Sequence, residues 1–487
     1  SSGHGCEICG QVFFINQHVK LCSLFELLST MENRFENVPD KHKKSLFGEL
    51  GLVRIPSDWA ALIFPSAAVF LIHVTGYGLL FLLHLVLART MATSEYGLYV
   101  YVLAWSYILS IVAALGMPTS NLRFIPLYLS QGKSDLVRGV SRISRLLSVG
   151  NGVILALCVS FFFLAVKKFW LPELGWSILF GIWTIPALAV IEVQRSLLQS
   201  IKKVIHAYTP PLLIKPFLLI VTTVLFFHVS QKQALNSSTL FVITLLVLFF
   251  IVILQSVLLE RCYRPKLLPG PATYETGRWL KTSIPLLFTS FFKILTYQSD
   301  LLMVGLILGS TEAGIYNIAA KTANLASFFY LAVAAIAAPK ISGYYASGDK
   351  KKLRKLMSSV THIVFWPTFV FSIMLLLGHH TILTLFGEQF LRAKWVLFIL
   401  IGSQLINAAT GLVGYLLDLT GHQLTTLRLR GLCVVLNIIL NTIGILLFGI
   451  IGAALASMIT VSIEKICLLV VSFKKMGING SLLSLFK

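Results

Sequence analysis

The chain has 487 residues, of which 56% are hydrophobic and only 12% are charged. Soluble domains carry about 25% charged residues, so this sequence is too apolar to cover a water-facing surface, and we predict an integral membrane protein. The 40 Lys and Arg against 19 Asp and Glu give a net charge of +21, and the position of these cations along the chain decides what the charge means.

The first 30 residues contain four candidate zinc ligands, Cys6, Cys9, His18 and Cys22, in the pattern C-x2-C-x8-H-x3-C. Three thiolates and one imidazole at this spacing can surround zinc tetrahedrally. The pattern resembles small C2HC zinc fingers with a shortened central loop, and the zinc is expected to be structural because protein fills all four positions. The alternative is a disordered or mistranslated extension upstream of Met31, an alternative start. We expect no secretory signal peptide.

Apolar stretches near or above 18 residues recur from about residue 58 onward, and each can cross about 30 Å of hydrocarbon as a helix. The final two are separated only by a Gly-rich turn at Gly449 to Gly452, so they form either a hairpin or one broken helix. The fold class is therefore all-α and polytopic. We predict about twelve spans, at 60–88, 97–120, 143–166, 174–198, 208–228, 239–259, 282–309, 315–338, 358–378, 394–417, 430–449 and 450–472.

Most Lys and Arg residues fall in alternate connections, after the even-numbered spans, and in the C-terminal tail. Positively charged connections favour the cytoplasm, so we expect both termini there and a multi-pass protein of the plasma membrane. The basic clusters at 138–145 and 350–355 are suited to anionic lipid headgroups, at about 1 kcal/mol per cation. No basic domain with interleaved aromatic residues lies outside the spans, so we expect no nucleic-acid partner.

An internal repeat relates the two halves of the chain. Glu95-Tyr-Gly97-Leu-Tyr99 follows the first span, and Glu312-Ala-Gly314-Ile-Tyr316 follows the seventh. A second repeated pattern relates residues 128–136 to residues 344–353. Because the offset covers six spans, we predict parallel six-helix lobes with a cleft between them. The predicted domains are an extension (1–30), a cytoplasmic segment (31–59), the first lobe (60–260), a cytoplasmic linker (261–281), the second lobe (282–475) and a cytoplasmic tail (476–487).

The run from Ala88 to Tyr99, followed by 123–132, resembles the N-terminal signature of the polysaccharide and oligosaccharide flippase family. Residues 300–305, the element at Gly314, Lys321 and Pro339 resemble the seventh and eighth helices of that family. The similarity covers roughly residues 60 to 475. It extends to the wider superfamily, which includes multidrug extruders and peptidoglycan-precursor flippases.

This resemblance implies two six-helix lobes that open alternately to each membrane face. It also implies a lipid-linked oligosaccharide as substrate, moved without a cofactor by a monomer in polysaccharide biosynthesis. The alternative is a cation-coupled multidrug or metabolite antiporter. That alternative is weakened because no Asp or Glu lies between Trp59 and Ala88, in the first span, where cation-coupled extruders of the superfamily usually carry one.

Charges inside membrane helices cost about 2.5 to 3.5 kcal/mol at the helix centre and usually face a cavity or a partner. Among the charged residues predicted inside the spans, Lys and Arg outnumber Asp and Glu, which suits a diphosphate ligand. Lys293 and Asp300 lie about 10 Å apart along one helix, too far to pair, so we expect Lys321 to neutralise Asp300 from the next helix. The candidates are Lys215, Lys293, Asp300, Lys321, the Glu464-Lys465 pair, Glu192 and Arg195.

Each candidate has a structural interpretation as well. Lys293 and Lys321 either receive the diphosphate or form ion pairs that fix packing. Lys215 lies in a Pro-rich helix start, where snorkelling or a kink explains it, and Glu192 with Arg195 has the spacing of an intrahelical pair.

Two histidines and two glycine elements complete the candidates. His73 and His84 either couple a proton gradient to transport or are neutral core residues. We expect Gly97 and Gly314 to form turns between helices, with Tyr96, Tyr99 and Tyr316 at the membrane interface.

No nucleophile-base-acid set, Walker loop or dinucleotide turn is present in a suitable context, so we predict that the chain is not an enzyme. A membrane polysaccharide polymerase or ligase is the remaining enzyme hypothesis. It depends on the outward connection that carries His379, His380, Glu388 and Arg392.

Overall fold

The structure, a computed structural model, describes residues 57–170, 175–231, 233–263, 270–478 and 480–482. Its contacts divide the chain into a unit that ends at Ala68, of which only the start of α3 (Ser57–Thr90) is described, and a unit from Val69 to Lys487. The second unit contains the remainder of α3 and every later helix. The predicted zinc ligands Cys6, Cys9, His18 and Cys22 lie outside the described residues.

The first half of the chain builds its spans from helices that are interrupted at glycine or proline. The breaks fall at Gly116, before the Pro-containing α5, and at Pro210 and Pro211, where a short π-helical segment η1 replaces the regular ladder. Its elements are α3 (Ser57–Thr90), α4 (Thr93–Ala113), α5 (Met117–Ser130), α6 (Ser134–Trp170), α7 (Gly175–Ile182), α8 (Thr184–Ser200), α9 (Val204–Thr209), η1 (Pro210–Ile214), α10 (Lys215–Val229) and α11 (Ser237–Tyr263).

The second half repeats this plan. Its elements are α12 (Thr276–Leu308), α13 (Ser310–Asn324), η3 (Leu325–Ser327), α14 (Phe328–Ala346), α15 (Lys350–Leu377), α16 (His379–Phe386), η4 (Glu388–Ala393), α17 (Lys394–Ala409), α18 (Val413–Leu419), α19 (Gln423–Phe448) and α20 (Ile450–Met476).

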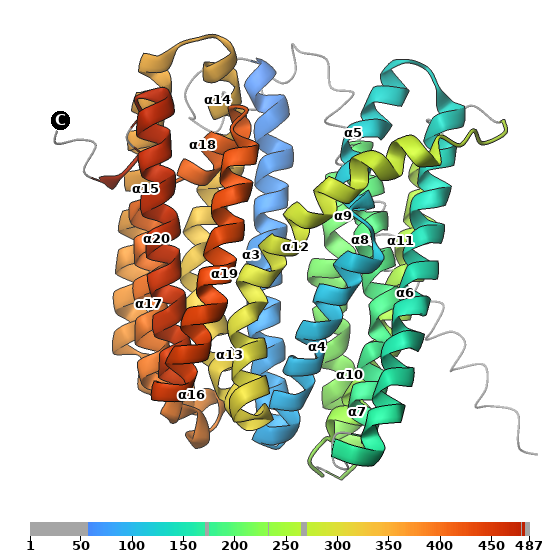
Figure 1. Cartoon of the computed structure of the whole chain (residues 1–487), viewed down its shortest axis with the longest axis vertical. Coiled ribbons are helices and arrows are strands. Elements are labelled where there is room, and N and C mark those ends of the chain that lie inside the picture. Colours follow the sequence, from blue (N-terminus) through green and yellow to red (C-terminus); the bar gives the residue numbers. More distant parts are fainter. Residues whose placement is uncertain (1–56, 171–174, 232, 264–269, 479, 483–487) are drawn as a thin grey trace, which may run out of the picture. The chain divides into compact units, whose positions relative to one another are not determined.

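Eleven helical segments of the described residues are long and apolar enough to span a membrane, which confirms an all-α, multi-pass membrane protein. The predicted span at 315–338 is divided into α13, the 3-10 turn η3 and α14, so it does not count as one long apolar helix. The connecting helix α12 packs against α5 of the first half and against α13 and α19 of the second. Figure 1 shows α12, in yellow, passing between them.

The final two spans form a hairpin, one of the two predicted arrangements. Gly449 adopts φ +59°, which a residue with a Cβ rarely adopts, and it separates α19 from α20. A Cβ on Gly452 would lie 1.8 Å from the carbonyl oxygen of Gly444, so the two helices touch through backbone near the turn.

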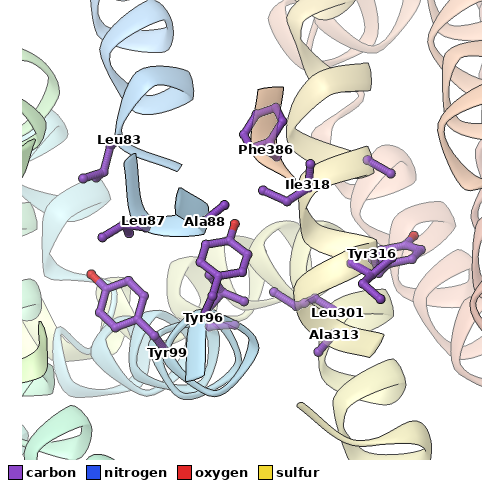
Figure 2. Packing of buried hydrophobic residues seen from close by; sticks show 14 of the residues in the cluster. Leu83, Leu87, Ala88, Tyr96, Tyr99, Leu301, Ala313, Tyr316, Ile318 and Phe386 are labelled. Carbon is purple, nitrogen blue, oxygen red and sulfur yellow. The ribbon is translucent and has the colours of Figure 1, made fainter. Parts of the chain in front are cut away.

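Three apolar cores show how the halves are joined. One core contains residues of both halves, including Leu87, Tyr96, Ala313 and Phe386. Figure 2 shows these side chains interleaved. A second core lies around Phe124 and consists of first-half residues together with Trp279 of α12, and a third core lies within the second half. The largest apolar contact between the halves is therefore the shared core, and Trp279 and the ring contact of Phe70 with Phe328 join them elsewhere.

Candidate functional site

The two copies of the repeated element pack directly against each other. A Cβ on Gly97 would lie 1.7 Å from the backbone oxygen of Ser310, and a Cβ on Gly314 would lie 3.0 Å from Cα of Gly97. Helices α4 and α13 can therefore cross this closely only because both positions lack a side chain. The expectation that Gly97 and Gly314 form turns is wrong, because both lie inside helices.

The tyrosines of the repeat are buried, which corrects their predicted place at the membrane interface. Tyr96 is 0% exposed, and Tyr99 and Tyr316 are 2% exposed. Figure 2 shows all three within the shared core. They are found there because the close helix crossing excludes solvent and lipid, and each phenol meets a polar partner in the core.

A hydrogen-bonded chain crosses the same contact. The Asn317 side-chain amide donates to the Tyr96 hydroxyl at 2.7 Å, and that hydroxyl lies 3.0 Å from Nδ1 of His84. Because the hydroxyl accepts from Asn317, its own hydrogen is free to be donated to Nδ1 of a neutral His84 ring. This geometry favours the neutral core interpretation of His84.

The acidic residue of each copy anchors a different segment. Glu95 accepts from the backbone amide and the hydroxyl of Ser237, at the start of α11, at 2.6 and 2.5 Å. Glu312 pairs with Arg392 at 2.9 Å. Arg392 belongs to the outward connection on which the enzyme hypothesis depends. Because Arg392 is paired with Glu312, this part of the connection packs against α13.

Asp300 is held by neutral donors rather than by a lysine. Its carboxylate accepts from Tyr316 at 3.0 Å, from Asn441 at 2.8 Å, from Asn437 at 3.3 Å and from the Ser457 hydroxyl. The prediction that Lys321 neutralises Asp300 is wrong. The reason is that Asp300 meets the face of α13 that carries Tyr316, together with α19 and α20, whereas Lys321, five residues further along α13, lies on another face of that helix.

Lys321 lies instead within electrostatic range of Lys215, a lysine of the other half. The Lys215 ammonium donates to the Tyr107 hydroxyl at 3.0 Å, and Lys321 interacts electrostatically with both Tyr107 and Lys215. Within the described residues neither lysine forms an ion pair with an acid. We call Lys215 and Lys321 the lysine pair. Two neighbouring cations without an acid form a site suited to a multiply charged anion.

A second group of charges lines the inner side of the first half. Glu192 and Arg195 form the predicted intrahelical pair, at 2.5 and 3.1 Å. The Arg195 guanidinium also lies 5.2 Å from the centre of the Tyr208 ring, and the His73 ring lies 5.0 Å from the same ring. His73 is therefore near this ion pair, whereas His84 belongs to the shared core.

The second half contributes an ion-pair network that the sequence analysis missed. Arg430 lies 3.2 Å from Asp418 and 3.6 Å from Glu464. The predicted span at 430–449 places Arg430 at its end, but α19 begins at Gln423, so Arg430 lies about two turns inside the helix. The neighbouring Lys465 lies 5.6 Å from the centre of the Tyr330 ring.

Lys293 connects these two charged groups. Its electrostatic neighbours are Arg430 and Asp418 of the second half and Arg195 and Glu192 of the first. The structure thus separates two lysines that the sequence predicts in one site. Lys293 joins a group of balanced charge, whereas Lys321 joins Lys215.

The metal prediction stays untested. Among the described residues, no group of three or more His, Cys, Asp or Glu side chains is arranged to hold a metal ion. The four predicted ligands lie in the part of the chain that the structure does not describe.

Comparison with known sequences assigns the family. The sequence model of the family described as polysaccharide biosynthesis protein matches residues 66–345, more than half of the chain. The chain belongs to this family. The MatE family model also matches the chain, over residues 285–443.

A curated protein similar to this chain is the probable low-salt glycan biosynthesis flippase Agl15 of Haloferax volcanii. It is 27% identical over 168 residues, which cover 34% of this chain and 36% of the relative. The alignment therefore spans about a third of that relative's length.

Solved structures show the same fold at low sequence identity. An inward-facing multidrug resistance MATE family transporter of the MOP superfamily aligns with a TM-score of 0.65 at 13% identity, covering 83% of this chain and 94% of the other. The lipid II flippase MurJ, in an inward closed conformation, aligns with a TM-score of 0.57 at 18% identity, covering 87% and 91%.

Proposed function

We propose that this protein is a transporter, not an enzyme, that flips a lipid-linked oligosaccharide between membrane leaflets. The observation that carries the proposal is the lysine pair, contributed by opposite halves. The diphosphate of a polyprenyl carrier is a multiply charged anion of the kind that two desolvated ammonium groups bind. Membership of the polysaccharide biosynthesis family and the similarity to a probable glycan flippase support a glycan substrate.

Alternating access follows from the way the halves are joined. They share a large apolar core at the end that carries Gly97 and Gly314, whereas the cores toward the other end consist mainly of residues from one half each. Because Lys and Arg gather in the connections at that other end, we infer that it faces the cytoplasm of the cell membrane. A diphosphate bound between Lys215 and Lys321 offsets their repulsion and so favours closer approach of the halves.

The test is flipping of a fluorescent polyprenyl-diphosphate oligosaccharide in proteoliposomes. Lys215→Ala and Lys321→Ala are each expected to reduce the initial rate at least tenfold, and Lys293→Ala less, because its site is balanced by acids. The matched control is Lys355→Ala, an exposed lysine of the basic cluster. Normal flipping by the Lys215→Ala/Lys321→Ala double variant, in folded protein, contradicts the diphosphate role.

Cation-coupled antiport is the second candidate, and it is favoured by one observation. The four hydrogen-bond partners of Asp300 are neutral, and none of the described ion pairs includes it. An uncompensated buried carboxylate attracts a cation. Substrate-stimulated proton or sodium flux in vesicles that disappears in Asp300→Asn, without any flipping of the lipid-linked glycan, supports antiport over flipping.

A further inference from the structure

Five tyrosines from five different helices of both halves lie within electrostatic range of one another or in ring contact. They are Tyr77 (α3), Tyr208 (α9), Tyr297 (α12), Tyr330 (α14) and Tyr415 (α18), and we call them the tyrosine chamber. The rings of Tyr330 and Tyr415 lie 6.2 Å apart. Tyr297 is within electrostatic range of Tyr77 and Tyr415, and Tyr415 is within range of Tyr208. This one ring contact and these electrostatic neighbours link all five.

Three of the five tyrosines have exposed surface, and two of them line a pocket. Tyr297 is 71% exposed, Tyr77 is 38% exposed and Tyr415 is 36% exposed. A pocket of about 220 Å³ is lined by Tyr77, Tyr415 and His73, together with apolar residues of α3 and α14. This differs from Tyr96, Tyr99 and Tyr316 of the repeat, which are enclosed in the shared core.

Ion pairs of both halves border the chamber. Glu192 and Arg195 lie beside Tyr208, and the network of Arg430, Asp418 and Glu464 interacts with Tyr297 and Tyr330. Lys293 lies between these groups, and Lys465 lies over Tyr330. Four cations and three acids therefore surround the five phenols, so the charge is nearly balanced.

Open aromatic faces with charged pairs at their edges suit a neutral polyol. The C–H bonds on one face of a pyranose ring form an apolar patch that packs on the negative face of an aromatic ring. Its hydroxyl groups donate to carboxylates and accept from guanidinium groups. A carboxylate and a guanidinium that stay bonded to each other still have lone pairs and N–H groups left over. These groups can bond to sugar hydroxyls without either ion losing its partner.

We infer that the tyrosine chamber binds the sugar portion of the substrate, while the lysine pair binds its charged portion. This rests on the proposed function for the link between the two parts. Lys321 and Tyr330 are nine residues apart through α13, η3 and α14, which corresponds to about 15 Å along this run of helices. One head group can reach both sites, with its phosphates toward the shared core and its sugars toward the chamber.

The experiment measures the two ligand classes separately, on the full-length protein in lipid nanodiscs. Neutral oligosaccharides are presented on a glycan microarray, and the strongest binder is then titrated by calorimetry. Inorganic pyrophosphate is titrated in parallel. Tyr297→Ala/Tyr330→Ala is expected to weaken oligosaccharide binding at least tenfold and pyrophosphate binding less than twofold. Lys215→Ala/Lys321→Ala is expected to show the reverse.

Two further variants serve as controls for misfolding. Tyr345→Ala removes an exposed tyrosine of α14 outside the chamber and is expected to bind both probes like the unaltered protein. Tyr297→Phe/Tyr330→Phe keeps the rings and is expected to retain at least a third of the oligosaccharide affinity. If the unaltered protein binds no neutral oligosaccharide, or if the tyrosine variants lose both probes equally, the inference is overturned.

The flipping assay separates this inference from the proposed function. Oligosaccharide binding that depends on the chamber, in a protein that does not flip the lipid-linked glycan, supports the chamber and contradicts the flippase. Normal flipping by Tyr297→Ala/Tyr330→Ala supports the flippase and overturns the chamber.

Discussion

The two copies of the repeated Glu-x-Gly-x-Tyr element have the same backbone role but bind different partners. Gly97 and Gly314 meet at one helix crossing. Tyr99 bonds to the neutral hydroxyl of Thr244, whereas Tyr316 donates to the carboxylate of Asp300. The comparison teaches that the glycine serves the same close backbone packing in both copies, whereas the tyrosine bonds to a neutral hydroxyl in the first copy and to a carboxylate in the second.

The largest expected effect comes from the crossing. In Gly97→Ala the new methyl group would lie 1.7 Å from a backbone oxygen that cannot rotate away. Helix propensity favours Ala by about 1 kcal/mol, but displacing the helices is expected to cost about 3 kcal/mol. The measurement is the free energy of unfolding in mixed detergent micelles containing increasing sodium dodecyl sulfate.

Gly78→Ala is the matched control, because a Cβ at that position of α3 meets no atom within 4 Å. It is expected to be neutral or slightly stabilising. Gly314→Ala should fall between the two, since its nearest atoms lie 3.0 to 3.2 Å away. Equal stability of Gly97→Ala and Gly78→Ala would show that the crossing is looser than described.

The tyrosines of the two copies are expected to differ in what they contribute. Tyr316→Phe removes a hydrogen bond to a carboxylate and is expected to cost about 2 kcal/mol. Tyr99→Phe removes a bond between neutral groups, which in membrane proteins averages about 0.6 kcal/mol. The difference should disappear when Asp300 is replaced by Asn, and its persistence in that background contradicts the assigned role of the carboxylate.

The smallest effect is expected for the two glutamates. Glu95→Gln weakens the contacts at the start of α11 and is expected to cost about 1 kcal/mol. Glu312→Gln breaks a pair whose arginine is 65% exposed, which is expected to cost about 0.5 kcal/mol. Thermal unfolding of both variants in low and high salt tests the assignment, because only the exposed pair should lose its contribution in salt.

Several elements of the fold were predictable from the sequence, for physical reasons. Long apolar runs require helices in a bilayer, since every backbone polar group must be bonded within its own segment. The repeat of Glu95 to Tyr99 at Glu312 to Tyr316 indicated two related halves. The pairing of Glu192 with Arg195 was also predictable, because residues three apart in a helix are neighbours.

The candidate site was less predictable. The partner of Lys321 was wrongly assigned because proximity of two spans in the chain does not determine which faces they turn toward each other. Tyr297, Tyr330 and Tyr415 were missed as members of one group. The available signal was the presence of tyrosines inside apolar spans, where a phenol requires a polar partner or a cavity.

Composition and hydropathy were sufficient to establish a multi-pass helical protein, because the free energy of burial in lipid depends on residues that are adjacent in the chain. The meeting of Lys215 with Lys321, the enclosure of Asp300 and the convergence of five tyrosines depend on how separate helices pack. Those contacts join residues up to hundreds of positions apart. They are set by close packing between helices, for example where Gly97 and Gly314 have no side chain and the backbones touch. Such packing cannot be read from residues that are neighbours in the sequence.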